Sequence, residues 1–254
     1  MLKAITRAVS RAILNCELTH LARVPIDLEN ARRQHRLYEQ ALRDLGVEVL
    51  SLPEEPDLPD SVFVEDTAIV LDECAIITRP GADSRKPETA SIAEALRPYR
   101  SLHQVSAPGT VDGGDVLTVG KTLWVGLTSR SDLAAVEQMR AFLQPYGYTV
   151  RTACVRGCLH LKSAVTQAAE RTLLINPAWV ERADFPGMDF IEVDPGEPSA
   201  ANLLLVGGKP VYQPAYPKTL ERLQAAGIDP LLVDASELAK AEGALTCCSL
   251  LFNA

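Results

Sequence analysis

The stretch Asn30–Pro53, NARRQHRLYEQALRDLGVEVLSLP, sets a pattern that the rest of the chain repeats. Residues 30–45 have helical apolar spacing, Gly46 is typical of a helix C-terminus, and 47–53 is a short apolar strand. The same order returns at 91–105, 132–152 and 217–233, while a weaker strand at 190–193 follows only a short segment. Strand starts near 47, 102, 148, 190 and 228 lie about 40 to 55 residues apart, a spacing that predicts repeated units.

Paired strands are expected between the helical segments. Val116–Val119 and Thr122–Leu127 form a predicted hairpin around Gly120-Lys121, and Leu203–Val206 and Lys209–Tyr212 form another around Gly207-Gly208. Ser61–Val64 is expected to be a strand that leads into 67–71, with 74–78 following. Each unit then reads hairpin, helix, strand, about five times over. No linker divides the chain, so the expectation is one α/β domain spanning 1–254.

Composition limits the classes of function. The chain has 254 residues, 47% of them hydrophobic, and a formal net charge of −8, which argues against nucleic acid or an anionic membrane as partners. No apolar segment approaches the roughly 18 residues of a membrane span, and residues 1–7 lack the apolar region of a signal peptide. The six cysteines have no disulfide spacing, so we expect free thiols and a cytoplasmic protein.

Two adjacent cysteines, Cys247 and Cys248, stand in the apolar segment Leu245–Ala254. If this segment is a strand, the two thiols point to opposite faces and only one can reach a given pocket. A catalytic cysteine needs a histidine and a carboxylate. The four histidines are His20, His35, His103 and His160; His35 is expected on a solvated helix face and His103 in a structural role. On its local pattern alone His160 would be a core histidine, and it becomes the candidate base because the chain also offers a cysteine that needs one.

Acidic and basic residues in turns supply the other candidates. Asp112 lies in Pro108–Val116, PGTVDGGDV, where a carboxylate between apolar residues could orient a histidine. The acidic set is Asp60, Glu65 and Asp66, and the basic pair that could bind a carboxylate is Arg85 and Arg130. Turn structure and surface charge are the plainer interpretations of these residues. Neither zinc-ligand spacing nor a nucleotide-binding glycine loop occurs, so no metal and no cofactor is expected.

Together, these segments resemble the dimethylarginine dimethylaminohydrolase family, within a superfamily of guanidino-group-modifying enzymes. The resemblance runs over nearly the whole chain. The chain is too short to contain the helical insertion of typical arginine deiminases. The segments that carry it are Pro59–Asp66, Ile77–Gly81 with Arg85, Thr110–Asp115, Leu159–Lys162, Ala200–Asn202 and Leu245–Ser249. The resemblance implies a five-bladed α/β propeller of ββαβ modules, in agreement with the five strand starts.

The resemblance also implies an activity and a role for each candidate residue. The activity is hydrolysis of Nω-methylated arginine to citrulline and methylamine or dimethylamine. Cys247 would be the nucleophile, His160 the general acid and base, and Asp112 the residue that orients His160. Some members carry Glu in place of Asp112, which leaves its distance to His160 open. The residues that would bind substrate are Asp60, Glu65 and Asp66 at the guanidinium, Arg85 and Arg130 at the α-carboxylate, and the backbone near Leu18 and Ala241 at the α-amino group.

Other functions stay open at this point. A deiminase acting on free arginine or on agmatine is the nearest alternative, although agmatine has no carboxylate for the two arginines. A non-catalytic arginine-binding protein, or a thiol-redox protein that uses Cys247 and Cys248 as a sensor, belongs to a different class. The expected partner is a small-molecule substrate, and self-association as a homodimer is a further expectation.

Overall fold

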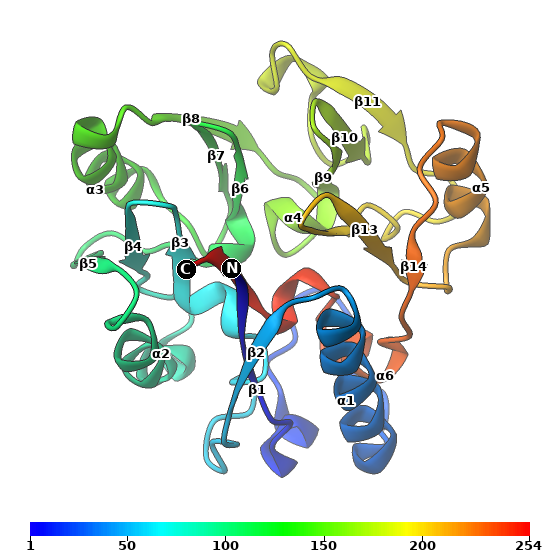
Figure 1. Ribbon diagram of the computed structural model, residues 1–254, viewed down its shortest axis with the longest axis horizontal. Coiled ribbons are helices and arrows are strands. Elements are labelled where there is room, and N and C mark those ends of the chain that lie inside the picture. The colour runs from blue at the N-terminus through cyan, green and yellow to red at the C-terminus, as the bar shows by residue number, and fades with distance from the viewer.

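In the computed structural model, which describes all 254 residues, five three-stranded sheets surround a central axis with the larger helices outside them (Figure 1). In each sheet the first two strands are antiparallel, and the third runs parallel to the second. The sheets are β15–β1–β2 (Leu250–Asn253, Leu2–Arg7, Glu48–Leu52), β3–β4–β5 (Ala68–Val70, Cys74–Ile77, Ser101–Gln104), β6–β7–β8 (Val116–Val119, Thr122–Leu127, Thr149–Cys154), β9–β10–β11 (Val165–Ala169, Thr172–Ile175, Asp189–Glu192) and β12–β13–β14 (Leu204–Val206, Lys209–Tyr212, Leu231–Leu232).

In four of the five repeats a helix connects the second strand to the parallel third strand, because parallel strands need a crossover. These helices are α1 (Leu28–Asp44), α2 (Thr89–Leu96), α3 (Leu133–Leu143) and α5 (Pro217–Ala225). Between β10 and β11 the crossover has only a 3₁₀ turn, Arg182–Asp184, in a segment that contains Pro177 and Pro186. Two short helices, α4 (Leu161–Ala164) and α6 (Ser236–Ala239), lie near the ends of sheets. The predicted five-bladed propeller of ββαβ modules is confirmed.

The chain closes the first sheet with its last strand. β15 pairs antiparallel with β1, so Leu2 lies opposite Asn253. The two glycine hairpins are also confirmed: Val119 pairs with Thr122 and Val206 with Lys209, as two-residue turns require. Five clusters of buried apolar side chains fill the protein between and beneath the sheets. Cys16 and Cys248 belong to the largest cluster.

His35 corrects one expectation. It lies on the buried face of α1 and is 3% exposed, because its helical position follows Ala31 and precedes Tyr38 and Leu42 on the face that packs inward. Burial lowers the pKa of His35 to about 4, despite Glu39 at 3.8 Å. His35 is therefore a neutral core residue rather than a solvated one. His103, on β5, stacks on Phe142 in the structural role that was expected.

Two predicted strands are wrong in ways that affect the site. Residues 59–62 form a turn and Val64–Thr67 form a 3₁₀ turn, because the carbonyls of Asp60 and Phe63 accept hydrogen bonds from Arg85. The cysteine pair also lies in a 3₁₀ turn, Thr246–Cys248, and the strand begins only at Leu250. The argument from strand alternation was therefore wrong, although the two thiols do face different surroundings.

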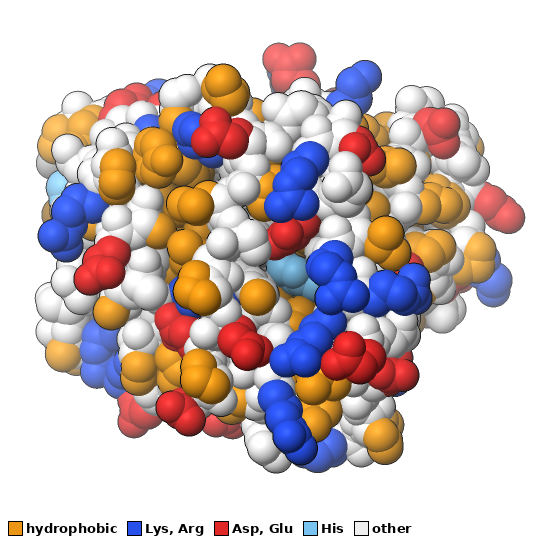
Figure 2. Space-filling view, turned by 60° about the horizontal axis from the view of Figure 1, so that its bottom comes forward, with side chains coloured by type: hydrophobic (Ala, Val, Ile, Leu, Met, Phe, Trp, Pro, Cys, Tyr) orange, Lys and Arg blue, Asp and Glu red, His pale blue; other side chains and the backbone are white.

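No helix is both long enough and apolar enough to cross a bilayer. The face brought forward in Figure 2 mixes acidic and basic side chains, with Lys and Arg gathered around a histidine near its middle. All six cysteines are unpaired.

The buried hydroxyl pair of Tyr38 and Ser249, 2.6 Å apart, ties α1 to the segment after the cysteines. Tyr38→Phe leaves the buried Ser249 hydroxyl without this partner, so we expect unfolding in urea to require about 1–2 kcal/mol less free energy. Tyr146→Phe is the control, because the Tyr146 hydroxyl makes no protein hydrogen bond. Equal midpoints for the two variants would contradict this account.

Candidate active site

Twelve residues from segments far apart in sequence converge on one small cavity of about 20 Å³. Seven of the ten predicted site residues line it directly, namely Ala241 and the charged or reactive residues Asp60, Asp66, Arg85, Arg130, His160 and Cys247. Leu18 instead packs against the largest apolar cluster, and Glu65 faces a second cavity. Asp112 lies directly behind His160.

His160 is the centre of the site. Its Nε2 lies 3.0 Å from Asp112 Oδ2, and its Nδ1 lies 3.8 Å from Asp66 Oδ1. Burial alone lowers the pKa of His160, but the carboxylates of Asp66, Asp115 and Asp112 outweigh it and raise the pKa to about 9. The imidazole is therefore protonated at neutral pH. The distance that the sequence left open, from Asp112 to His160, is that of a hydrogen bond.

Glycines allow this close packing. Gly113 and Gly114 follow Asp112 as a 3₁₀ turn. A Cβ on Gly114 would lie 2.6 Å from His160 Nδ1 and 2.8 Å from Asp66 Oδ1, and one on Gly113 would lie 1.9 Å from the carbonyl oxygen of Glu65. Only glycine fits between these groups. The Gly114 N–H also donates to Asp66 Oδ1 at 2.9 Å, which fixes that carboxylate.

Asp115, in the same motif, has a positioning role that the sequence analysis did not assign. It is fully buried and accepts hydrogen bonds from the Leu161 N–H at 2.9 Å and from the hydroxyls of Ser131 and Thr128. Burial raises its pKa to about 6, against the opposing effect of His160. Asp115 thereby holds the backbone next to His160 in place. The spacing of the two aspartates around Gly-Gly was the only signal of this role.

Arg85 is enclosed by acceptors. Its guanidinium bonds Asp66 through Nη1, Glu88 through Nε and Nη2, and the carbonyls of Asp60 and Phe63 through Nη2. Nη1 carries two hydrogens and uses one, so a single N–H is left for a ligand. The partner Glu88 is buried and was not identified from the sequence. Burial raises the pKa of Glu88 to about 7 in spite of Arg85.

Arg130 is the freer of the two arginines. Its Nη2 donates to Thr19 Oγ1 at 3.2 Å, and Nη1 lies 3.7 Å from Asp112 Oδ2. Asp60, on the same cavity, accepts the Glu17 N–H at 3.1 Å, and burial raises its pKa. For Asp66, burial also favours the neutral form, but His160 and Arg85 outweigh it and lower the pKa to about 2. The cavity therefore has a fixed negative charge at Asp66 and a positive charge at Arg130.

The two thiols differ in surroundings. Cys247 lines the small cavity beside His160, whereas Cys248 is 1% exposed within the apolar cluster and lies 3.4 Å from the Ala244 carbonyl. Burial, together with the carboxylates of Glu65 and Asp66, raises the pKa of the Cys247 thiol. Without a ligand, Cys247 is therefore a thiol rather than a thiolate.

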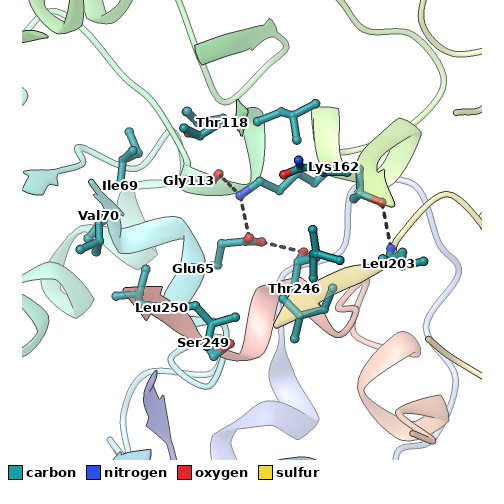
Figure 3. Close-up of a pocket in the computed structure, with 18 residues that line it drawn as sticks. Glu65, Ile69, Val70, Gly113, Thr118, Lys162, Leu203, Thr246, Ser249 and Leu250 are labelled. Carbon is teal, nitrogen blue, oxygen red and sulfur yellow. Dashed lines mark hydrogen bonds and ion pairs between the residues drawn. The ribbon is translucent and has the colours of Figure 1, made fainter. Parts of the chain in front are cut away.

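A second cavity, of about 240 Å³, follows the propeller axis beneath the site (Figure 3). Three of the side chains that line it are joined by polar contacts. Lys162 Nζ lies 2.7 Å from Glu65 Oε1, and the Thr246 hydroxyl donates to Glu65 Oε2 at 2.9 Å. Burial raises the pKa of Glu65, and Lys162 opposes this effect. The adjacent residues Glu65 and Asp66 thus line different cavities. Glu65 lines the larger cavity along the propeller axis, and Asp66 lines the small cavity that also holds His160 and Cys247.

One group of side chains has a geometry that a metal ion could also use. Asp66, Asp112 and His160 offer ligand atoms within 4.8 Å of one another. Arg85 and Arg130 already lie beside these two carboxylates, so a divalent ion would have to displace or neutralise cations. The absence of a metal requirement stays a prediction.

Comparison with known proteins decides the family. Residues 21–181 match the family model described as "N,N dimethylarginine dimethylhydrolase, eukaryotic". The dimethylarginine dimethylaminohydrolase of Streptomyces coelicolor is 41% identical over 252 residues, which cover 98% of this chain and 96% of that protein. The chain belongs to the dimethylarginine dimethylaminohydrolase family. The resemblance seen in its sequence motifs is confirmed.

Two solved structures of family members share the whole fold. A Cys-to-Ser mutant of the Pseudomonas aeruginosa enzyme, complexed with citrulline, superposes with a TM-score of 0.92 at 32% identity and covers 98% of each chain. A His-to-Gly mutant dimethylarginine dimethylaminohydrolase, as an adduct with S-methyl-L-thiocitrulline, also gives 0.92 at 33% identity, over 98% of this chain and 99% of that one. The fold of this family member is thus the fold of those enzymes.

Gly114→Ala should separate His160 from Asp66, because the added methyl group has no space between them. We expect turnover of a methylated arginine to fall by about 10²-fold or more, the size of a general acid–base contribution. Gly196→Ala is the control, since Gly196 lies in a surface turn where a Cβ would contact only Asp194 and Lys218 side chains. Near-normal kcat for Gly114→Ala in folded protein would contradict the packing argument.

Proposed function

We propose that this protein hydrolyses Nω-methylated arginine to citrulline and dimethylamine or methylamine through a covalent intermediate on Cys247. The observation that carries the proposal is a buried, protonated His160 held by Asp112 and Asp66 in the same small cavity as Cys247. Membership of the family and the solved citrulline complex of a relative support it. The enzyme belongs to the hydrolases that act on C–N bonds of linear amidines.

The charges of the cavity fit the two ends of such a substrate. We assign Asp60 and Asp66 to the guanidinium, since a cation is stabilised beside fixed carboxylates. Glu65, which Lys162 and Thr246 engage, would add negative charge from behind rather than a first contact. For the α-carboxylate, Arg130 would be the main partner, and the one free N–H of Arg85 would add to it. The carbonyls near Leu18 and Ala241 would accept from the α-amino group.

In the first step a C–S bond forms and a C–N bond breaks. Cys247 gives its proton to solvent before it attacks, and a bound guanidinium beside it favours the thiolate by charge attraction. The thiolate adds to the guanidinium carbon, and His160 gives its proton to the departing methylated amine. A thiouronium-type intermediate on Cys247 remains, and His160 is left neutral.

In the second step water replaces the sulfur. Neutral His160 takes a proton from water, and the resulting hydroxide adds to the thiouronium carbon. The C–S bond then breaks, the hydroxyl proton passes to the departing sulfur and restores the Cys247 thiol, and the carbon–oxygen bond becomes the ureido carbonyl of citrulline. Asp112 keeps the imidazole aligned through both proton transfers, at 3.0 Å from Nε2.

The substrate prediction is citrulline release from asymmetric dimethylarginine and monomethylarginine, with much slower release from arginine. Agmatine should be the poorest substrate because it offers no carboxylate to Arg130 and Arg85. The assay is colorimetric citrulline detection, or N-carbamoylputrescine for agmatine, with reduced protein in the presence of a chelator. If no guanidino compound is turned over, the catalytic proposal fails. If arginine is preferred, the enzyme is instead a deiminase.

The two cysteines make a matched pair of variants. Cys247→Ser should lower kcat by about 10³-fold or more, since an alkoxide is harder to form than a thiolate. Cys248→Ser should keep most of the activity, because its side chain packs in the apolar cluster and away from the cavity. The reverse ranking of the two variants would contradict the assignment of the nucleophile.

The pH dependence follows from His160. Its pKa of about 9 exceeds the ordinary value, so the acid form that the leaving amine requires is present at neutral pH and is lost as the pH rises through about 9. We therefore expect kcat/KM to fall above about pH 9. Asp112→Asn removes one of the carboxylates that raise this pKa, so the falling limb should move to lower pH. A limb at an unchanged position would show that Asp112 does not act through His160.

Three further expectations stay predictions. They are a single catalytic domain over 1–254, a cytoplasmic location, and association as a homodimer. Size-exclusion chromatography with light scattering measures the last of these directly.

A further inference from the structure

The cavity that holds His160 and Cys247 is small. Its volume of about 20 Å³ has room for about one water molecule, so an amino acid cannot enter unless a covering segment moves. Residues 17–21 are that segment. Glu17 lines the cavity and its N–H bonds Asp60, Thr19 accepts a hydrogen bond from Arg130, and Leu21 is 51% exposed.

A single carboxylate holds this segment. Glu242 accepts hydrogen bonds from the backbone N–H groups of Thr19, His20 and Leu21, at N···O distances between 2.5 and 3.1 Å. Three successive backbone donors around one carboxylate form a strong, charge-assisted contact. Glu242 and Gly243 also line the adjoining cavity of about 410 Å³, as do His20 and Leu21, so this contact separates the two cavities.

The backbone at Glu242 is unfavourable for a glutamate. Its φ of 58° makes it the one non-glycine residue of the chain with a positive φ. It follows α6, where Glu242 N–H bonds the Ala239 carbonyl and Gly243 N–H bonds the Leu238 carbonyl. This is the helix-ending motif in which glycine usually takes the left-handed position. Glycine would end the helix here without strain, so the helix end does not account for the glutamate side chain.

We propose that Glu242 is a positioning residue that latches residues 19–21 over the bound substrate and so encloses its amino-acid end. The inference rests on the proposed function, since Leu18, Ala241 and Arg130 are the groups assigned to that end. When the latch opens, the catalytic cavity joins the larger one and substrate can pass. When it closes, Thr19 stays beside Arg130, and the backbone N–H of Glu17 stays bonded to Asp60.

The first test needs no substrate. Hydrogen exchange of the Thr19, His20 and Leu21 amides, measured by NMR in ligand-free protein, should be about 10-fold or more faster in Glu242→Gly than in the parent. Glu242→Gln, which keeps one acceptor oxygen, should be intermediate, and the exposed Glu221→Gln should match the parent. Unchanged exchange in Glu242→Gly overturns the latch, whatever the enzyme's substrate.

The second test separates positioning from stability. Glycine removes the strain at a positive φ, so Glu242→Gly should unfold at the same or a higher urea concentration than the parent. Its KM for dimethylarginine should nevertheless rise by about 10- to 100-fold, with a much smaller change in kcat, and Glu242→Gln should recover part of the loss. A fall in kcat at unchanged KM, or an unchanged KM, overturns the proposal.

Discussion

The site depends on one buried ionic cluster, the imidazolium of His160 among the carboxylates of Asp112, Asp66 and Asp115. A charge removed from water must be paired and hydrogen-bonded, or it becomes neutral. Each carboxylate is accordingly fixed by backbone N–H groups: Gly81 for Asp112, Gly114 for Asp66 and Leu161 for Asp115. The fold supplies these donors from separate blades, so the protonated histidine exists only when the propeller is assembled.

The propeller also explains why adjacent residues have different tasks. The inner strands leave a cavity along the axis, and short 3₁₀ turns at their ends separate it from the catalytic cavity. A 3₁₀ turn sends neighbouring side chains in different directions. Glu65 therefore meets Lys162 on the axial side (Figure 3), while Asp66 meets His160. Cys247 likewise faces the site, while Cys248 packs in the core.

Much of this architecture could be predicted from sequence, because local signals were strong where helices end in glycine and where two-residue turns join strands. The motifs also indicated Cys247, His160 and Asp112 correctly as neighbours. Tertiary contacts decided the rest. The run 61–64 has the composition of a strand, but Arg85 donates hydrogen bonds to the carbonyls of Asp60 and Phe63. His35 looked solvated among arginines, yet it faces the core. Glu88 and Glu242 had no local signal, since an acid in a polar segment is ordinarily exposed.

The most direct test of the central claim is an NMR titration of the imidazole of His160, assigned by the signal lost in His160→Gln. In ligand-free enzyme the resonance should titrate with a pKa near 9, raised by the surrounding carboxylates. In Asp112→Asn the pKa should be lower. A His160 that titrates at or below its ordinary value near 6.5 would contradict the account, because the imidazole would then be mostly neutral at neutral pH and the surrounding carboxylates would not stabilise its acid form.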